Sequence, residues 1–187
     1  MSKGNFILKL YQAKNTVFTA KEIALLLSET NKNALKSKIS YYAKKGTLRR
    51  VWRGIYVKPD YDKLELATKV YTPSYVGLET VLAKEGVIFQ HYETTFIISY
   101  LSRKLAIDGQ EIQIRKIKNE VLLNPKGIFK KENYSIAIKE RAFLDTLYLY
   151  KNYHFDNLEA LDKNEVFELM RIYGNKEVEK TVKRLFG

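Results

Sequence analysis

Apolar residues recur at helical spacing near the start of the chain. Three segments place apolar side chains three or four positions apart, a pattern typical of amphipathic helices; they are residues 5–13, 19–27 and 33–45. Thr19 and Glu22 have the spacing of a capping box, so we expect the second helix to begin there. Gly46 follows two lysines and suits the end of the third helix. The polar residues 28–32 are the expected turn between the second and third helices.

The pattern then changes to two short strands. Residues 48–57 are rich in side chains that favour strands, and Arg53-Gly54 supplies a turn between them. Trp52 and Tyr56 could stack on a nucleic-acid base or pack the strands onto the helices, and we favour packing. Two helices separated by a turn and followed by a β-ribbon are the order of a winged helix-turn-helix. The sequence therefore predicts a DNA-binding domain of this type over residues 1–60.

The remaining residues, 61–187, mix strand and helix signals. Asp108-Gly109 between two strand-like segments is a strong signal for a two-residue hairpin. Residues 67–71 are interpreted as a strand or an extended lead-in, and Pro73 precedes a helix expected over 75–85. Further strands are expected at 87–89, 94–101, 105–107, 111–117 and 134–138, and further helices at 140–150, 163–173 and 176–185.

The predicted fold class is α+β. An N-terminal winged helix-turn-helix would be followed by a mixed α/β domain, which would have a small antiparallel sheet and terminal helices. The domain boundary is placed at residue 60, where acidic residues begin to interrupt the basic character of the chain.

Positive charge is concentrated in the first third of the chain. The whole sequence has 33 Lys and Arg against 21 Asp and Glu, a net charge of +12. Residues 1–60 hold 13 of the basic and 3 of the acidic residues, a net of +10, which leaves 20 basic and 18 acidic residues, a net of +2, in the rest. Such a distribution indicates a polyanionic partner, and double-stranded DNA fits the predicted helices best.

Other function classes are disfavoured by composition. The absence of cysteine excludes disulfides and thiolate metal sites. No segment approaches the roughly 20 apolar residues needed to span a bilayer, and the first apolar run is too short for a signal peptide. The sequence predicts a cytoplasmic protein with no membrane partner.

The residues expected to contact DNA lie on the outer face of the third helix and on the ribbon. Asn can pair with adenine and Lys with guanine in the major groove, so Asn33 and Lys36 are the predicted base-reading residues. The other side chains would contact phosphate or position the helix, although a merely solvated helix face is the alternative. The full set is Asn31, Lys32, Asn33, Lys36, Ser37, Lys38, Ser40, Tyr41, Lys44, Lys45, Arg49, Arg50 and Arg53.

A second basic surface is predicted in the C-terminal domain as a hypothesis about RNA or DNA contact. A solvated strand face explains its residues equally well. The set is Arg103, Lys104, Arg115, Lys116 and Lys118.

Catalytic chemistry finds little support. The two histidines, His91 and His154, are far apart and lack the neighbours of a metal site, and there is no glycine-rich phosphate loop. A metal-dependent nuclease would need Glu79, Asp108 and Glu111, with Gln113 or Arg115 in place of a lysine, but Asp108 is better explained as a turn residue. We therefore expect no catalytic residues, no metal and no cofactor. A winged helix that binds protein rather than DNA stays an alternative, and the 14 tyrosines fit core packing better than RNA stacking.

Three motifs in a fixed order connect the chain to a known family. They are Lys45-Gly46-x-Leu48 leading to Arg53-Gly54-Ile55-Tyr56, then Pro73-x-Tyr75-x-Gly77-Leu78-Glu79, then Ala137-Ile138-Lys139-Glu140-Arg141-Ala142. In this order the chain resembles the AbiEi-type antitoxins of type IV toxin–antitoxin systems, also described as AbiEi-family transcriptional regulators, over roughly residues 18–186. It departs from them at Lys139, where the family often has proline, and at Arg141, where it often has lysine.

The resemblance implies a function in abortive infection and phage resistance. The N-terminal winged helix would repress its own operon by binding inverted repeats, and the C-terminal domain would carry the antitoxic function. The counterpart would be a nucleotidyltransferase-like toxin that forms no stable complex with the antitoxin.

Overall fold

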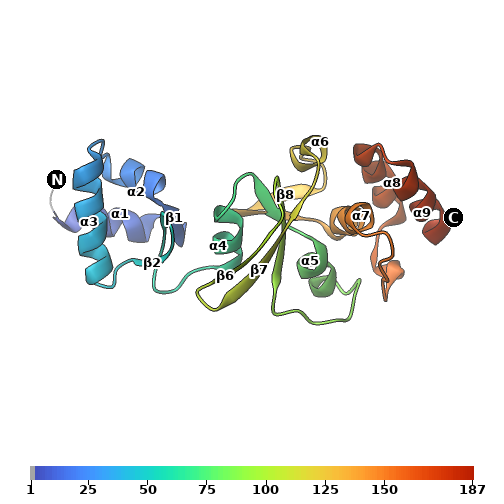
Figure 1. Cartoon of the computed structure of the whole chain (residues 1–187), viewed down its shortest axis with the longest axis horizontal. Coiled ribbons are helices and arrows are strands. Elements are labelled where there is room, and N and C mark those ends of the chain that lie inside the picture. The colour runs from blue at the N-terminus through green and yellow to red at the C-terminus, as the bar shows by residue number, and fades with distance from the viewer. Residues whose placement is uncertain (1–2) are drawn as a thin grey trace. The chain divides into compact units, whose positions relative to one another are not determined.

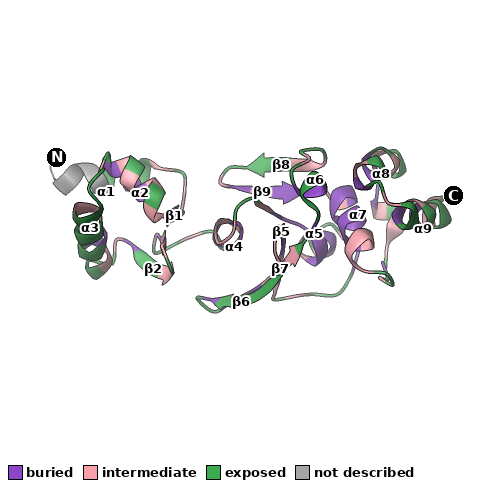
Figure 2. Cartoon of the chain, turned by 45° about the horizontal axis from the view of Figure 1, so that its top comes forward, coloured by how far each residue is buried: buried purple, intermediate pink, exposed green. Residues whose placement is uncertain are grey.

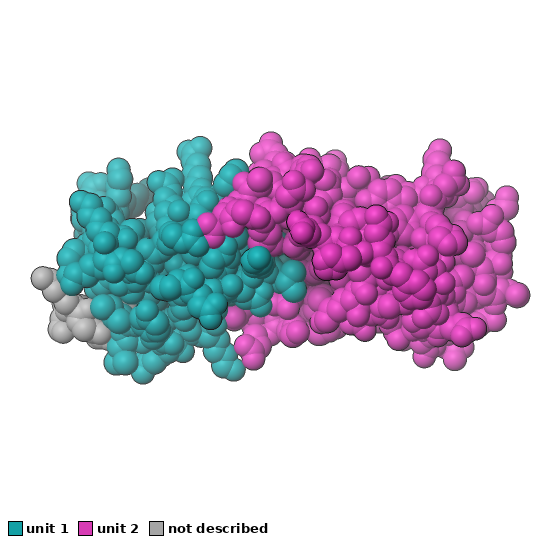
Figure 3. Space-filling view, turned by 90° about the horizontal axis from the view of Figure 1, so that it is seen from below, with its two compact units in different colours: residues 1–70 teal, residues 71–187 magenta. Residues whose placement is uncertain are grey.

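The computed structural model describes residues 3–187, and the chain divides into two compact units, residues 1–70 and 71–187 (Figure 3). The first unit ends ten residues beyond the boundary expected from the sequence. The cause is a short helix, Lys63–Lys69, whose buried Glu65 bonds to the first unit.

The first unit contains four helices and a three-stranded antiparallel sheet among its described residues (Figure 1). Its strands lie in the order β1-β3-β2. The elements are α1 (Lys3–Gln12), β1 (Val17–Thr19), α2 (Ala20–Leu27), α3 (Lys32–Lys44), β2 (Arg49–Trp52), β3 (Ile55–Val57) and α4 (Lys63–Lys69).

The helix boundaries of the first unit follow from local capping. The predicted capping box of α2 is confirmed: the Glu22 amide donates to Thr19 Oγ1 at 3.2 Å, and the Thr19 amide donates to the Glu22 carboxylate at 2.6 Å. After α3, Gly46 has φ +72°, the left-handed conformation that ends a helix.

The predicted β-ribbon is also confirmed, because β2 and β3 pair antiparallel around Arg53-Gly54.

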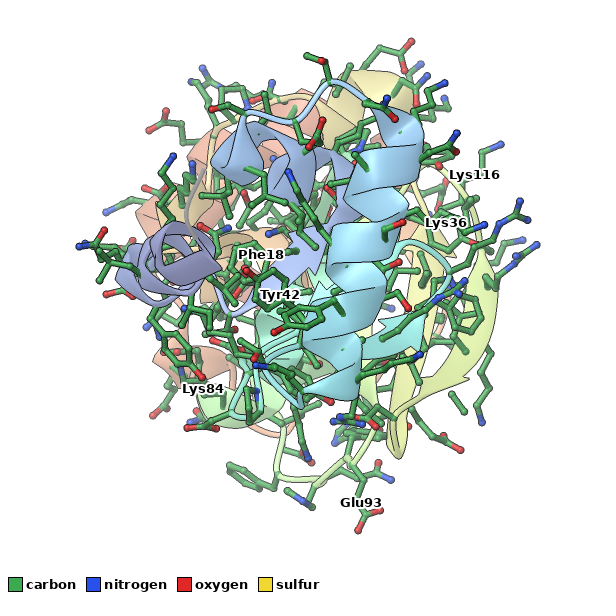
Figure 4. All side chains as sticks on the ribbon, turned by 90° about the vertical axis from the view of Figure 1, so that its left-hand side faces the viewer. Phe18, Lys36, Tyr42, Lys84, Glu93 and Lys116 are labelled. Carbon is green, nitrogen blue, oxygen red and sulfur yellow. The ribbon has the colours of Figure 1, made fainter. Side chains whose placement is uncertain are left out.

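The core of the first unit lies between the helices and the sheet. Figure 4 shows Phe18 and Tyr42 in the interior behind α3, whereas Lys36 lies on its outer side. The buried residues of this core are Leu10, Phe18, Ile23, Leu27, Ile39, Tyr42 and Leu48, and the half-buried Tyr56 packs against them.

Two sequence expectations in this unit were wrong. The strand β1 was not expected, because three residues are too few to give a periodic signal; it forms by pairing Val17–Thr19 with β3. Residues 67–71 were expected to be extended, but most of them belong to α4, which Asp62 caps by accepting from the amides of Leu64 and Glu65.

The second unit is built on a six-stranded mixed sheet with the strand order β6-β7-β5-β4-β9-β8. The pairs β4–β9 and β5–β7 are parallel and the others are antiparallel. Its strands are β4 (Ser74–Val76), β5 (Thr95–Ser99), β6 (Arg103–Ile107), β7 (Gln110–Lys116), β8 (Ile128–Lys131) and β9 (Tyr134–Ala137). Its helices are α5 (Leu78–Lys84), α6 (Asn119–Leu122), α7 (Lys139–Leu149), α8 (Lys163–Met170) and α9 (Lys176–Phe186), with short 3₁₀ turns at Leu158–Ala160 and Arg171–Tyr173.

This sheet corrects the expectation of a small antiparallel sheet in the C-terminal region. Residues 74–76 form β4 rather than the start of a helix, residues 87–89 lie outside the strands, and β8 was not expected. The hairpin is confirmed, since Asp108 and Gly109 have φ of +52° and +75° between β6 and β7, as a type I′ turn requires.

With helices and sheets in both units, the chain is a mixed α+β protein. None of its described helices is long and apolar enough to cross a membrane.

Burial differs strongly between the helices. Figure 2 shows α7 as mainly buried, whereas α3 and α9 expose much of their surface. The α7 face includes Arg141 and Asp145, both fully buried, with Arg141 Nε 3.3 Å from Asp145 Oδ1. Tyr75 and Tyr173 each donate a hydroxyl hydrogen to this carboxylate, at 2.8 and 2.7 Å.

The Arg141 guanidinium also orders the chain after α6. It donates to the carbonyl oxygens of Lys126 at 2.8 Å and Val121 at 2.6 Å. Gly127 must be glycine here, because it has φ +71° and a Cβ would lie 2.9 Å from the Cβ of Arg141. Burial lowers the pKa of Arg141, but Asp145, Tyr173 and Tyr75 together outweigh burial and raise the pKa, so the guanidinium stays protonated.

Candidate nucleic-acid interface

The outer face of α3 is polar, cationic and exposed. The helix contains no carboxylate, so nothing on it opposes an approaching phosphate. The predicted contact residues that the structure places on this exposed face are Lys32, Asn33, Lys36, Ser37, Lys38, Ser40, Tyr41 and Lys44.

Asn31 and Lys38 of the predicted set have structural partners near the start of α3. Asn31 is the N-cap of α3, and its side-chain oxygen accepts from the amides of Asn33 at 2.9 Å and Ala34 at 3.1 Å. Lys38 forms an ion pair with Glu29, and this hydrogen bond lowers the pKa of the Glu29 carboxyl. Lys38 therefore brings less net positive charge to the surface than Lys36 does.

Tyr41 and Lys45 form a pair at the end of α3. The Lys45 ammonium lies 4.9 Å from the centre of the Tyr41 ring, and the Tyr41 hydroxyl raises the pKa of Lys45. Tyr41 is 39% exposed, and its ring packs edge-on against the ring of the buried Tyr42, with 5.2 Å between the ring centres. The pair places a cation and an aromatic ring together at the surface.

The β-ribbon presents Arg53 at its turn, exposed beside Gly54 with φ +75°. Arg50 Nε donates to the Trp52 carbonyl at 3.4 Å, and the Arg49 guanidinium lies 6.0 Å from the Tyr61 ring. Arg49 and Arg50 are neighbours on β2, so they project to opposite faces of the ribbon. Trp52 is half-buried, and the packing of Tyr56 on the core agrees with the interpretation that we favoured from the sequence.

The second basic set does not form a single surface on the sheet. In the β6–β7 hairpin, Arg103 pairs with Ile114 and Lys104 pairs with Gln113. Because side chains alternate between the two faces along each strand, Arg103 and Lys116 lie on one face. Lys104 and Arg115 lie on the other face. Lys118 lies beyond the strands, as the N-cap residue of α6.

Several residues of this second basic set also contact other side chains of the second unit. Lys104 pairs with Glu111 at 3.2 Å, the Arg115 guanidinium lies 4.7 Å from the Tyr150 ring, and Arg103 donates to the Tyr71 hydroxyl at 2.9 Å. The Glu111 carboxylate offsets the charge of Lys104, and the two tyrosines hold the guanidinium groups of Arg103 and Arg115 in place without changing their charge.

The three carboxylates that a metal-dependent nuclease would need do not form one site. Among the described residues, no group of three or more His, Cys, Asp or Glu side chains is arranged to hold a metal ion. Asp108 is the hairpin turn residue, Glu111 pairs with Lys104, and Glu79 lies buried on α5. Glu79, Asp108 and Glu111, the residues of the nuclease alternative that the sequence disfavoured, thus have three separate roles.

Glu79 provides a test of pH dependence. It is 6% exposed, and within the described part of the chain its Oε2 has no hydrogen-bond partner. Burial raises its pKa above the ordinary 4.5, against an opposing effect of Arg115. Because the folded protein then holds this proton more tightly than the unfolded chain, the carboxyl destabilises the fold increasingly as pH rises from 4.5 through the raised value.

We expect Glu79→Gln to raise the melting temperature at neutral pH and to leave it unchanged at about pH 3, where both states are protonated. Scanning calorimetry at both pH values measures the effect. Glu85→Gln, an exposed carboxylate at the end of α5, is the control and should change neither value. A lower melting temperature for Glu79→Gln at neutral pH would show that the carboxylate is stabilised by a partner.

Sequence reasoning missed the residues that hold α4 to the first unit. The Glu65 carboxylate is fully buried and accepts from the Thr16 amide at 2.9 Å and the Thr16 hydroxyl at 2.7 Å. Lys69 lies 3.1 Å from Glu65 and 3.0 Å from Glu22, the capping residue of α2, and donates to the Val17 carbonyl. Glu65 and Lys69 have the i, i+4 spacing of an ion pair on a helix. This pair was missed because residues 67–71 were interpreted as extended.

No protein-family model matches the chain, and the search of the curated proteins finds no match.

Proposed function

We propose that this protein is a sequence-specific DNA-binding transcriptional regulator whose first unit is a winged helix-turn-helix. One observation carries the proposal: α3 exposes a carboxylate-free face with Asn33 and Lys36, in the same unit as an arginine at the turn of the β2–β3 ribbon. Capped helices and a buried core hold this face, so the side chains are presented by a rigid element.

In this proposal α3 is the recognition helix and β2–β3 is the wing. The order of elements and the three-stranded sheet β1-β3-β2 support it. Recognition helices enter the major groove with their N-terminal residues near the base edges, which agrees with Asn33 and Lys36 in the first turns of α3. The net charge of +10 over residues 1–60 supplies the sequence-independent part of the affinity.

The resemblance to AbiEi-type antitoxins extends the proposal to the whole chain. The protein would repress its own operon through inverted repeats, and the second unit would act against a nucleotidyltransferase-like toxin without a stable complex. Growth rescue of cells that express the neighbouring toxin, by the full chain and not by residues 1–70 alone, would support this assignment. Rescue by residues 1–70 alone would remove the antitoxic role from the second unit.

Asn33→Ala should reduce affinity for the cognate site by about 1–3 kcal/mol and should hardly change binding to random DNA, because a bidentate contact to adenine is lost. Fluorescence anisotropy with both duplexes measures this. Ser37→Ala, on the same exposed face, is a matched control for small polar-to-alanine changes. Equal losses on both duplexes would make Asn33 a backbone contact instead.

Arg53→Ala should weaken binding to every duplex and make the plot of log K against log salt shallower by about one unit, because one phosphate contact is lost. A salt titration of wild type and variant gives both slopes. Arg171→Ala, an exposed arginine in the second unit, should leave the slope unchanged. If Arg53→Ala and wild type have the same slope, the ribbon does not contact DNA.

The proposal as a whole is tested by a gel shift with the protein's own upstream DNA and a scrambled duplex, at about 50 and 200 mM salt. A preference for the native fragment that persists at the higher salt would support an autoregulating repressor. Equal, salt-sensitive binding to both would mean a generic polyanion surface.

One observation favours a second candidate, a winged helix that binds protein. Leu8 and Tyr11 on α1 are each 57% exposed, and Leu25 on α2 is 79% exposed. Contiguous exposed apolar patches are typical of docking surfaces, and α1 and α2, which carry these side chains, are in contact. Loss of DNA preference in the gel shift would make this candidate the leading one.

A further inference from the structure

A polar hollow of about 310 Å³ lies in the second unit between the segment after α7 and the C-terminal half of α9. The first wall carries Lys151, Asn152, Tyr153 and His154, and the second carries Thr181 and Arg184 on α9. Residues 30 positions apart in sequence thus meet only through the packing of α9 on α7, where Phe186 contacts Phe143 at 5.7 Å between ring centres.

The charged side chains that line this hollow, Lys151 and Arg184, are both cationic. Among the described residues that line it, none has a carboxylate, and neither Lys151 nor Arg184 forms an ion pair with a described acidic side chain. Elsewhere in this unit Lys104, Lys126 and Arg141 each have a carboxylate partner. Two cations that line the same hollow without a described acidic partner attract a multiply charged anion.

The remaining lining groups narrow the ligand class. The Asn152 amide and the Thr181 hydroxyl can donate to acceptor oxygens, which phosphate supplies on every side. Arg is well suited to phosphate because its guanidinium can donate two parallel hydrogen bonds. Leu147 and Leu185 add an apolar wall, and a hollow of this volume has room for an organic group as well as the phosphate.

We infer that this hollow binds a phosphate monoester of nucleotide size, with Arg184 and Lys151 holding the phosphate from opposite walls. His154 is a lesser contributor, because its side chain is 87% exposed and lies 3.7 Å from the Asp156 carboxylate. The inference concerns the second unit and does not depend on DNA binding by α3.

Isothermal calorimetry on the full chain with 5′-AMP, adenosine and inorganic phosphate tests it. We expect AMP to bind with a dissociation constant below about 1 mM, inorganic phosphate more weakly, and adenosine not at all. Arg184→Ala and Lys151→Ala should each weaken AMP at least about tenfold, since each removes a charge-assisted contact. Lys183→Ala is the matched control: it is an exposed cation on α9, it does not line the hollow, and it should leave AMP binding unchanged.

A short 5′-phosphorylated dinucleotide separates the two sources of such a phosphate. Tighter binding of AMP would indicate a free nucleotide, and tighter binding of the dinucleotide a nucleic-acid end; either supports the phosphate site if Arg184→Ala abolishes the difference from adenosine. Equal binding of AMP by wild type, Arg184→Ala and Lys183→Ala would overturn the inference, and so would no detectable AMP binding by wild type.

Discussion

Arg141→Met is expected to destabilise the second unit by about 3–5 kcal/mol, the cost typical of breaking a buried ion pair by removing one partner. The variant leaves Asp145 fully buried with the hydroxyls of Tyr75 and Tyr173, and it removes the guanidinium donor from the carbonyls of Val121 and Lys126. Methionine fills similar space, so the loss reflects charge and hydrogen bonds rather than a cavity.

Amide hydrogen exchange in β4, α7 and the segment after α6 measures this prediction directly, because these parts meet at the guanidinium. Their protection should fall together in Arg141→Met. Arg171→Met, an exposed arginine in the same unit, should change stability by less than about 0.5 kcal/mol. Arg141→Lys keeps the charge without the planar fork and should lie between the two. Unchanged exchange in Arg141→Met would mean that the network contributes nothing to the fold.

Glu65→Ala is expected to destabilise the first unit by about 3 kcal/mol, because it removes the acceptor for two partly buried donors of Thr16 and one partner of Lys69. The Thr16 amide and hydroxyl would be left without their acceptor, and Lys69 would keep only Glu22 and the Val17 carbonyl. The consequence for function is that α4 belongs to the proposed DNA-binding unit, and a fragment ending at residue 60 would lack it.

Urea unfolding followed by Trp52 fluorescence reports on this unit alone, since Trp52 is the only tryptophan and lies half-buried at the end of β2. The midpoint should fall clearly for Glu65→Ala and less for Glu65→Gln, which keeps an oxygen for Thr16. Asp60→Ala, an exposed carboxylate nearby, should stay within about 0.5 kcal/mol of wild type. If Glu65→Ala and Asp60→Ala behave alike, α4 does not hold the unit together.

Local signals in the sequence were reliable where the cause is local. The capping box of Thr19 and Glu22, the helix-ending Gly46 and the Asp108-Gly109 hairpin depend on residues within a few positions of each other, and each is confirmed. The exposed face of α3 was also predictable, because helical periodicity alone separates Ile39 and Tyr42 from Lys36 and Ser40.

Errors arose where the partner lies far along the chain. The strands β1 and β8 exist because β3 and β9 pair with them, and segments of three and four residues carry no periodic signal of their own. Residues 75 and 76 were assigned to a helix because Pro73 suggested a helix start just before them, but pairing with β5 and β9 makes them part of a strand. The second basic set was predicted as one surface, and only strand register divides it between two faces.

The sequence by itself determined where charge is concentrated, which residues cap the helices of the first unit, and which side chains α3 exposes, because each depends on neighbours in the chain. Tertiary structure decided the rest. It buried Arg141 with Asp145, joined α4 to Thr16 through Glu65, and brought Lys151 and Arg184 to the same hollow. The physical reason is that burial and the pairing of distant charges depend on which elements pack together, and local periodicity does not specify that packing.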